Sequence, residues 1–149
     1  MLSHTAEYAL RALAHLAQTA RGQVVLGREL AAQTGIPSQY LSKVMLSLRN
    51  AGLVIATRGI GGGYMLLRPA DAIHLLDVVE LFDGPVGSPK CLLRGKHACS
   101  DQDACPAHRS WGKMRRSYQE FLEQTTLCQI TCKPAHNTQL TPPVRGMEL

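Results

Sequence analysis

The sequence predicts a mainly α-helical fold with one small β-hairpin. Three observations predict it: helical periodicity over the first 50 residues, two β-favouring runs around a glycine loop, and a long helical stretch beyond residue 106. The chain has 149 residues, 45% of them hydrophobic and 18% charged, so it can bury a core and fits one compact unit. Because it has only two Phe and one Trp, that core must be mostly aliphatic.

Three helices are predicted before residue 52. The first spans residues 3–19, and the second spans 28–34 and ends at Gly35, where a left-handed residue is favoured. The third begins at Ser38, a good N-cap, and ends at Gly52. The face of the first helix comprises Leu10, Leu13, Leu16 and Ala17, and the stripe of the third comprises Leu41, Val44, Met45 and Leu48. Helix, tight turn and helix in this order predict a helix-turn-helix motif.

The face of the third helix opposite its apolar stripe carries polar side chains suited to reading DNA. Gln39 and Lys43 lie in its N-terminal half, the part of a recognition helix that reaches base edges. Gln pairs with adenine and Lys with guanine in the major groove. A merely solvated helix face is the alternative, and the apolar Leu46 on this face argues slightly against it.

A hairpin follows the third helix directly. The runs 53–57 and 64–67 flank a loop that contains Arg58 and four glycines. Phosphate-binding glycine loops require a helix after the glycines, so this loop is a hairpin tip and predicts the wing of a winged helix. Arg58 suits phosphate or minor-groove contact, although an ordinary hairpin with an incidental Arg is the alternative.

Charge is segregated along the chain. Residues 21–68 carry six Lys and Arg side chains against the single acid Glu29, whereas residues 71–83 carry four acids and neither Lys nor Arg. The positive charge is therefore concentrated in the segment that is predicted to meet DNA phosphates.

All five cysteines lie between residues 91 and 132. Cys91, Cys99 and Cys105 are spaced C-x7-C-x5-C in a segment, 85–106, that is predicted to be an irregular loop. This spacing lacks the C-x2–4-C knuckle of structural zinc sites, and three thiols on a loop suit an iron–sulfur cluster. A metal-free thiol loop is the alternative.

Residues 107–127 predict one long helix with a seam of Trp111, Met114, Tyr118, Phe121 and Thr125. This seam favours pairing with a second copy of the chain, and packing within its own domain is the alternative.

We therefore divide the chain into a DNA-binding domain (1–84), a cysteine-bearing loop (85–106), a dimerisation helix (107–128) and a mobile tail (129–149). Cys128 and Cys132, spaced C-x3-C, receive no role.

No stretch approaches the ~20 apolar residues of a membrane helix, and the N-terminus lacks the pattern of a signal peptide. We therefore expect a cytoplasmic protein, whose reducing compartment disfavours a disulfide framework. No nucleophile–base pair or carboxylate pair stands out, so an enzyme is not expected.

Several short runs of sequence, taken together, are highly specific for one protein family. They are the segments 8–13 (YALRAL), 36–41 (IPSQYL), 48–54 (LRNAGLV), 58–64 (RGIGGGY) and 76–80 (LDVVE). In these runs the chain, over residues 1 to about 130, resembles the Rrf2 family of bacterial winged-helix regulators. The resemblance implies a homodimer on a palindromic promoter site, with occupancy set by a bound cluster.

By this resemblance Cys91, Cys99 and Cys105 match the cluster cysteines, although the first gap is seven residues where several members have five. Two residues match a fourth ligand: His108, as used with a 2Fe–2S cluster, and Glu7, which in other branches ligates the partner subunit's cluster. Glu7 is also simply an acid favoured by the helix dipole. The candidate DNA contacts are Ser38, Gln39, Tyr40, Lys43, Arg58 and Gly59, of which Arg58 matches the wing arginine.

The leading hypothesis is a repressor controlled by a 2Fe–2S or 4Fe–4S cluster that senses nitric oxide, redox state or iron supply. A regulator without a cluster, switched by reversible disulfides among its cysteines, is the second hypothesis. A redox protein that has lost DNA binding is the third.

Overall fold

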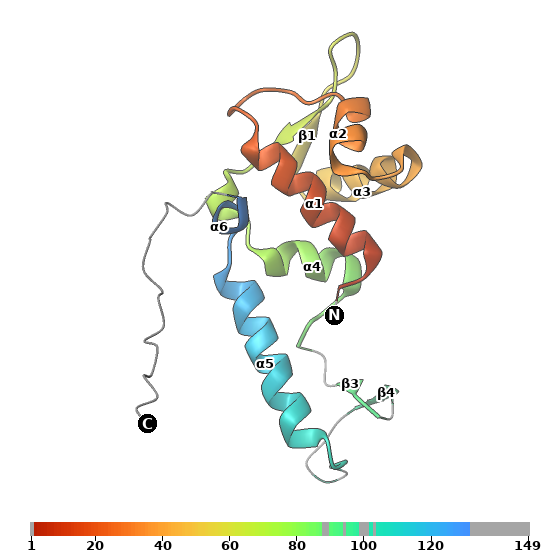
Figure 1. The fold of residues 1–149 in the computed structure, drawn as a ribbon, viewed down its shortest axis with the longest axis vertical. Helices are drawn as coiled ribbons and strands as arrows, with labels where there is room; N and C mark the ends of the chain where they lie inside the picture. Colours follow the sequence, from red (N-terminus) through yellow and green to blue (C-terminus); the bar gives the residue numbers. More distant parts are fainter. Residues whose placement is uncertain (1, 88–89, 94, 99–101, 103, 132–149) are drawn as a thin grey trace, which may run out of the picture.

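The computed structural model describes residues 2–87, 90–93, 95–98, 102 and 104–131. Figure 1 shows a group of helices with a protruding hairpin at one end and a long helix running down from this group. The elements are α1 (His4–Gln18), α2 (Gly27–Thr34), α3 (Ser38–Asn50), β1 (Val54–Ala56), β2 (Tyr64–Leu66), the 3-10 turn η1 (Ala70–Ala72), α4 (Leu75–Asp83), β3 (Lys90–Cys91), β4 (Gly95–Ala98), α5 (His108–Gln124) and α6 (Leu127–Thr131). The mainly α-helical fold with one wing is thus confirmed.

Helix α1 starts where Ser3 Oγ accepts a hydrogen bond of 3.2 Å from the amide of Ala6. Its buried face differs from the predicted one because small residues form most of it, while Leu10 and Ala17 are only half-buried. That face comprises Ala6, Ala9, Ala12, Leu13 and Leu16. Short side chains let the other helices pack close to α1.

The turn between α2 and α3 departs from the prediction in one detail. Gly35 takes the expected left-handed conformation, with φ 67°. The N-cap of α3, however, is Pro37 and not Ser38, and it makes no side-chain capping bond. Ser38 is instead the first helical residue, and the Pro37 carbonyl accepts from the amides of Tyr40 and Leu41 at 2.9 Å. Proline suits the start of a helix because it has no backbone N–H, and a backbone N–H at this position would lack a hydrogen-bond partner within the helix.

Strands β1 and β2 form the wing as an antiparallel pair in the register Val54↔Leu66, Ile55↔Met65 and Ala56↔Tyr64. The outer side of β2 is tied to the segment before α2, since Tyr64 and Val25 exchange two backbone hydrogen bonds of 2.8 and 2.9 Å. The approach is close enough that a Cβ on Gly63 would lie 2.1 Å from the Val25 carbonyl oxygen. The wing is therefore fixed to the helices at its base.

One aliphatic core joins these elements. It draws on α1, α2, α3, β1 and α4, and it includes Leu13, Leu30, Met45, Leu48 and Ile73, each of them fully buried. Leu127 of α6 belongs to the same core, so the chain returns to this unit after α5.

Helix α5 is shorter than predicted. It ends at Gln124, and the following backbone is extended at Thr125. The Leu75 amide donates to the Thr125 carbonyl and the Leu127 amide to the Ile73 carbonyl, at 2.9 and 2.8 Å. Pairing with the strand-like segment 73–75 thus replaces the last helical turn, and α6 begins as a separate helix.

The cysteine-bearing segment also contains regular structure that the sequence did not predict. Strands β3 and β4 form a short antiparallel hairpin that pairs Lys90 with Ala98 and Cys91 with Gly95. Cys99 and Cys132 lie outside the described residues, as does nearly all of the predicted tail. Within the described part of the chain, no helix is both long and apolar enough to cross a membrane.

Candidate DNA interface and cysteine site

Helix α3 presents the two faces that the sequence predicted. Leu41, Val44, Met45 and Leu48 are buried. Ser38, Gln39 and Lys43 are exposed. Leu46 lies on the outer surface, where 49% of the residue is exposed. The N-terminal half of α3 can therefore meet base edges and phosphates without any rearrangement of the core.

Tyr40 connects α3 to α1. Its ring packs edge-to-face on Tyr8, with centroids 6.2 Å apart, while 57% of the residue stays exposed. The Arg11 guanidinium lies 5.6 Å from the centre of the Tyr8 ring and donates to the Thr34 carbonyl at 3.3 Å. The contact between Tyr8 and Arg11 was not predicted from the sequence, although the two residues share a helix face at i, i+3.

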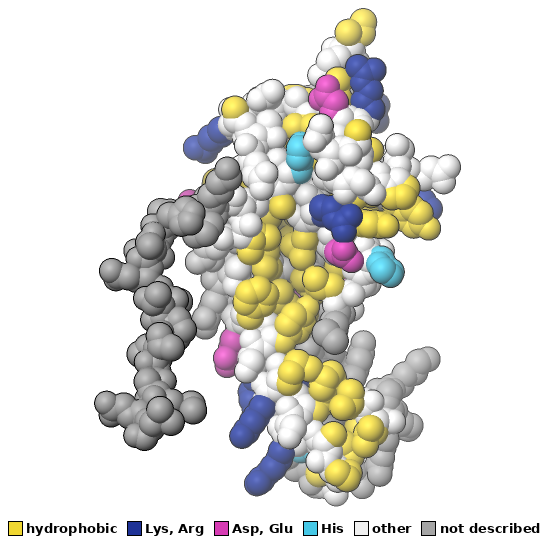
Figure 2. Space-filling model, in the orientation of Figure 1, with side chains coloured by type: hydrophobic (Ala, Val, Ile, Leu, Met, Phe, Trp, Pro, Cys, Tyr) yellow, Lys and Arg dark blue, Asp and Glu magenta, His cyan; other side chains and the backbone are white. Residues whose placement is uncertain are grey.

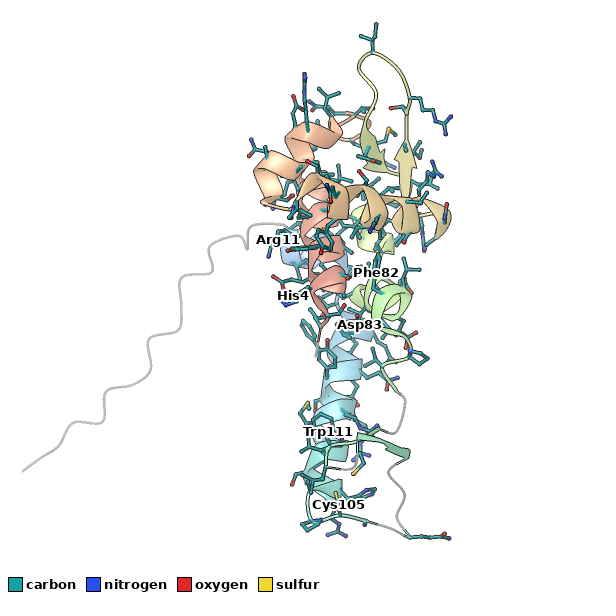
Figure 3. All side chains as sticks on the ribbon, turned by 90° about the vertical axis from the view of Figure 1, so that its right-hand side faces the viewer. His4, Arg11, Phe82, Asp83, Cys105 and Trp111 are labelled. Carbon is teal, nitrogen blue, oxygen red and sulfur yellow. The ribbon has the colours of Figure 1, made fainter. Side chains whose placement is uncertain are left out.

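Glu7 takes part in the same network. Arg11 Nη2 lies 2.5 Å from Glu7 Oε1, and His4 Nδ1 lies 3.8 Å from Glu7 Oε2. The carboxylate is thus already engaged on the exposed side of α1. Figure 3 places His4 and Arg11 on α1 in the helical group, and it places Cys105 at the lower end of the molecule, below Trp111 of α5. Within one chain, Glu7 and Cys105 are not brought together.

The wing tip places Arg58 and Gly59 in solvent. At its base the Thr57 amide donates to the Gly63 carbonyl, and the Gly63 amide donates to the Thr57 carbonyl, at 2.9 and 3.1 Å. Because both ends of the loop are held, Arg58 is presented at a defined point beyond the strands.

Two of the three predicted cluster cysteines lie side by side. Cys91 on β3 is only 6% exposed, and its Sγ is 3.8 Å from the Sγ of Cys105, in the segment that leads into α5. The His108 amide donates to the Cys105 carbonyl at 2.9 Å, so His108 opens α5 one turn after that thiol. The residues that the structure describes contain no group of three potential metal ligands, but Cys99 is outside that set.

Several basic side chains follow Cys105 along the chain. The first turns of α5 line a surface pocket of about 340 Å³ with His108, Arg109, Gly112, Lys113 and Arg116. Cys128 lies apart from the pair, half-buried on α6.

The family model described as Rrf2, iron-dependent transcriptional regulator, matches residues 2–133. The chain belongs to the Rrf2 family. An HTH-type transcriptional regulator of Mycobacterium tuberculosis is 38% identical over 149 residues, covering 99% of this chain and 92% of the relative. The regulator IscR of Erwinia tasmaniensis is 32% identical over 129 residues, covering 87% and 77%.

Solved Rrf2-type structures have the same fold. CymR, the global cysteine regulator of B. subtilis, superimposes with a TM-score of 0.74 at 30% identity, covering 88% of this chain and 95% of that one. IscR of T. potens superimposes with a TM-score of 0.69 at 27% identity, covering 96% and 93%. This Rrf2 protein is therefore a winged-helix, DNA-binding transcriptional regulator, as the sequence predicted.

Proposed function

We propose that this Rrf2 protein is a homodimeric repressor whose affinity for a palindromic operator is set by an iron–sulfur cluster at the cysteine site. The observation that carries the proposal is the 3.8 Å separation of Cys91 Sγ and Cys105 Sγ. Two thiolates on one tetrahedral metal, at metal–sulfur distances of about 2.3 Å, lie about 3.8 Å apart. The residues present thus fit a centre in which these two cysteines share one iron.

Cys91, Cys99 and Cys105 would hold the cluster, and His108 is the favoured fourth ligand because its amide is bonded to the Cys105 carbonyl. A shared iron favours the 2Fe–2S form over 4Fe–4S. When bound, the cluster supplies a redox-active centre that reacts with nitric oxide or oxidants. Glu7 would reach it only from the partner subunit, and it would first have to leave Arg11.

The DNA contacts proposed are Ser38, Gln39, Tyr40 and Lys43 on α3, with Arg58 and Gly59 on the wing. Residues 1–84 would bind DNA, 85–106 would sense and 107–128 would pair two subunits. Pairing through α5 is supported by Phe121 and Met114, which are exposed although apolar. Each subunit would then present one recognition helix, and the spacing between the two helices would set operator affinity.

Iron and sulfide analysis of protein purified without oxygen tests the cluster. The full chain is expected to contain both elements and to absorb visible light. Cys105→Ser should lose them, whereas Cys128→Ser, a control remote from the pair, should keep them. A full chain without iron would contradict the proposal. Comparing His108→Ala with Glu7→Ala identifies the fourth ligand by the larger loss of iron.

A thiol–disulfide switch is the second candidate, because the same two sulfurs are already in contact and CymR, a cysteine regulator, has this fold. Oxidation by a peroxide would take two electrons and two protons from Cys91 and Cys105 and form one sulfur–sulfur bond of about 2.05 Å. An iron-free protein that loses DNA affinity on peroxide treatment and recovers it with dithiothreitol would favour this candidate.

A further inference from the structure

The wing ends in a single apolar side chain. Ile60 is fully exposed, at 111% of its reference area, and it is the sole hydrophobic residue of the loop 57–63. Hydrophobic atoms accordingly stand at the outermost end of the molecule, beyond the last basic side chain (Figure 2). Scattered apolar side chains on a surface need no explanation. This one lies at the apex of a DNA-binding wing.

The loop holds that side chain outward in a defined turn. The Gly62 amide donates to the Gly59 carbonyl at 3.0 Å, which closes a four-residue turn with Ile60 at its second position. Gly61 follows with φ 82°, the left-handed conformation that a type II turn needs at its third position. A Cβ on Gly62 would lie 2.4 Å from the Thr57 carbonyl oxygen, so the turn also packs tightly against its own base.

The tip is also slim. Three of the four turn residues are glycines, so Ile60 provides the turn's one side chain. The DNA minor groove is about 6 Å wide and admits little more than a backbone with a few side chains. Arg58, two residues earlier, supplies the positive charge that such a groove attracts.

We propose that Ile60 is an apolar wedge that enters the minor groove of the operator and partly unstacks one base step. Apolar side chains, Ile among them, act in this way in proteins that bind the minor groove. The inference rests on the DNA recognition in the proposed function and adds a specificity determinant to it. Since pyrimidine–purine steps unstack most easily, Ile60 selects operators with such a step beneath the wing.

The test uses the full chain and a duplex that it selects itself from a random-sequence library. 2-Aminopurine is placed in turn at each base step in the flank that the wing covers, because its fluorescence rises when the base unstacks. The wild-type protein should raise the fluorescence at one step. Ile60→Ala should abolish that rise and weaken binding about 3- to 10-fold, and Ile60→Leu should restore both.

Leu67→Ala is the matched control, since Leu67 is an exposed leucine at the far end of the same hairpin, and it should behave as wild type. Repeating the selection with Ile60→Ala should remove the preference for a pyrimidine–purine step. An Ile60→Ala protein with wild-type fluorescence and step preference would overturn the wedge alone. A full chain that selects no duplex would overturn the proposed function together with it.

Discussion

The two ends of this molecule are held together in different ways. The winged-helix end has a continuous aliphatic core from α1 to α4, which α6 completes. In the cysteine-bearing end, from β3 to α5, the buried side chains among the described residues are Cys91 and Leu122. Figure 1 shows that α5 and the β3–β4 hairpin extend from the helical group rather than being enclosed by it. The first region can fold on its own contacts, whereas the second has little apolar burial to fix its shape.

That difference bears directly on function. A region held by few contacts changes its arrangement at low cost when a ligand or a second subunit binds. The connection to the winged helix runs through α4, where Leu75 and Val79 pack on Leu122 of α5. At the other end of α4, Asp83 accepts hydrogen bonds from the amide and hydroxyl of Ser3, the N-cap of α1. Helix α4 thus connects α5 to the helix that carries Tyr8 and Arg11.

The largest effect is expected in the winged-helix core. Leu48→Ala should lower the free energy of unfolding by about 2–5 kcal/mol, because Leu48 is fully buried and its removal leaves a cavity. Leu46→Ala, on the exposed side of the same helix, should change it by less than about 0.5 kcal/mol. Chemical denaturation measures both, and equal losses would contradict the packing of α3.

In the cysteine-bearing end, a similar truncation should destabilise α5 without destabilising the winged-helix core. Leu122→Ala removes the main apolar contact of α5 with α4 and should cost about 2 kcal/mol, the low end for such a change. Hydrogen exchange should show lost protection in α5 with α1 and α3 unchanged. If protection falls equally in all helices, the two regions form one cooperative unit.

The basic residues of the two ends should also differ in how much they contribute to DNA binding. Arg58→Ala should weaken binding to all DNA sequences and reduce the slope of log affinity against log salt by about 0.9, as expected for one phosphate contact. Lys113→Ala, in the basic pocket of α5, should leave the slope unchanged because α5 lies away from the wing. A salt titration of DNA binding compares the two variants, and equal slopes would remove the wing from the interface.

The smallest effect concerns Tyr118, at the α4–α5 contact. Burial, and secondarily the Asp83 carboxylate, raise the pKa of Tyr118 above its usual 10.0. The folded state therefore holds the phenolic proton more tightly, and this stabilisation is complete below pH 10 and is lost as pH rises through the raised pKa. The hydroxyl is buried without a hydrogen-bond partner among the described residues. Tyr118→Phe should change stability at pH 7 by less than about 0.5 kcal/mol and flatten the alkaline decline, as followed by denaturation at several pH values.

The sequence predicted the winged-helix end better than the cysteine end, for a physical reason. One face of α3 is buried, and its apolar residues therefore recur with helical spacing: Leu41, Val44, Met45 and Leu48. A periodic pattern of this kind can be recognised in the sequence. The end of α5 and the β3–β4 hairpin depend instead on backbone hydrogen bonds, such as Leu75 to Thr125, between distant segments of few apolar residues. Likewise, the contact between Cys91 and Cys105 depends on how the β3–β4 hairpin lies against the start of α5. The spacing of the cysteines in the sequence does not predict that arrangement.

Whether the cluster controls DNA binding is decided by measuring operator affinity with and without it. The same full-length protein, loaded anaerobically and then stripped of iron, is titrated against one self-selected duplex at a single salt concentration. We expect affinities that differ about 100-fold, equivalent to about 2.7 kcal/mol in binding free energy. Equal affinities of the two forms would contradict control of DNA binding by an iron–sulfur cluster at the cysteine site.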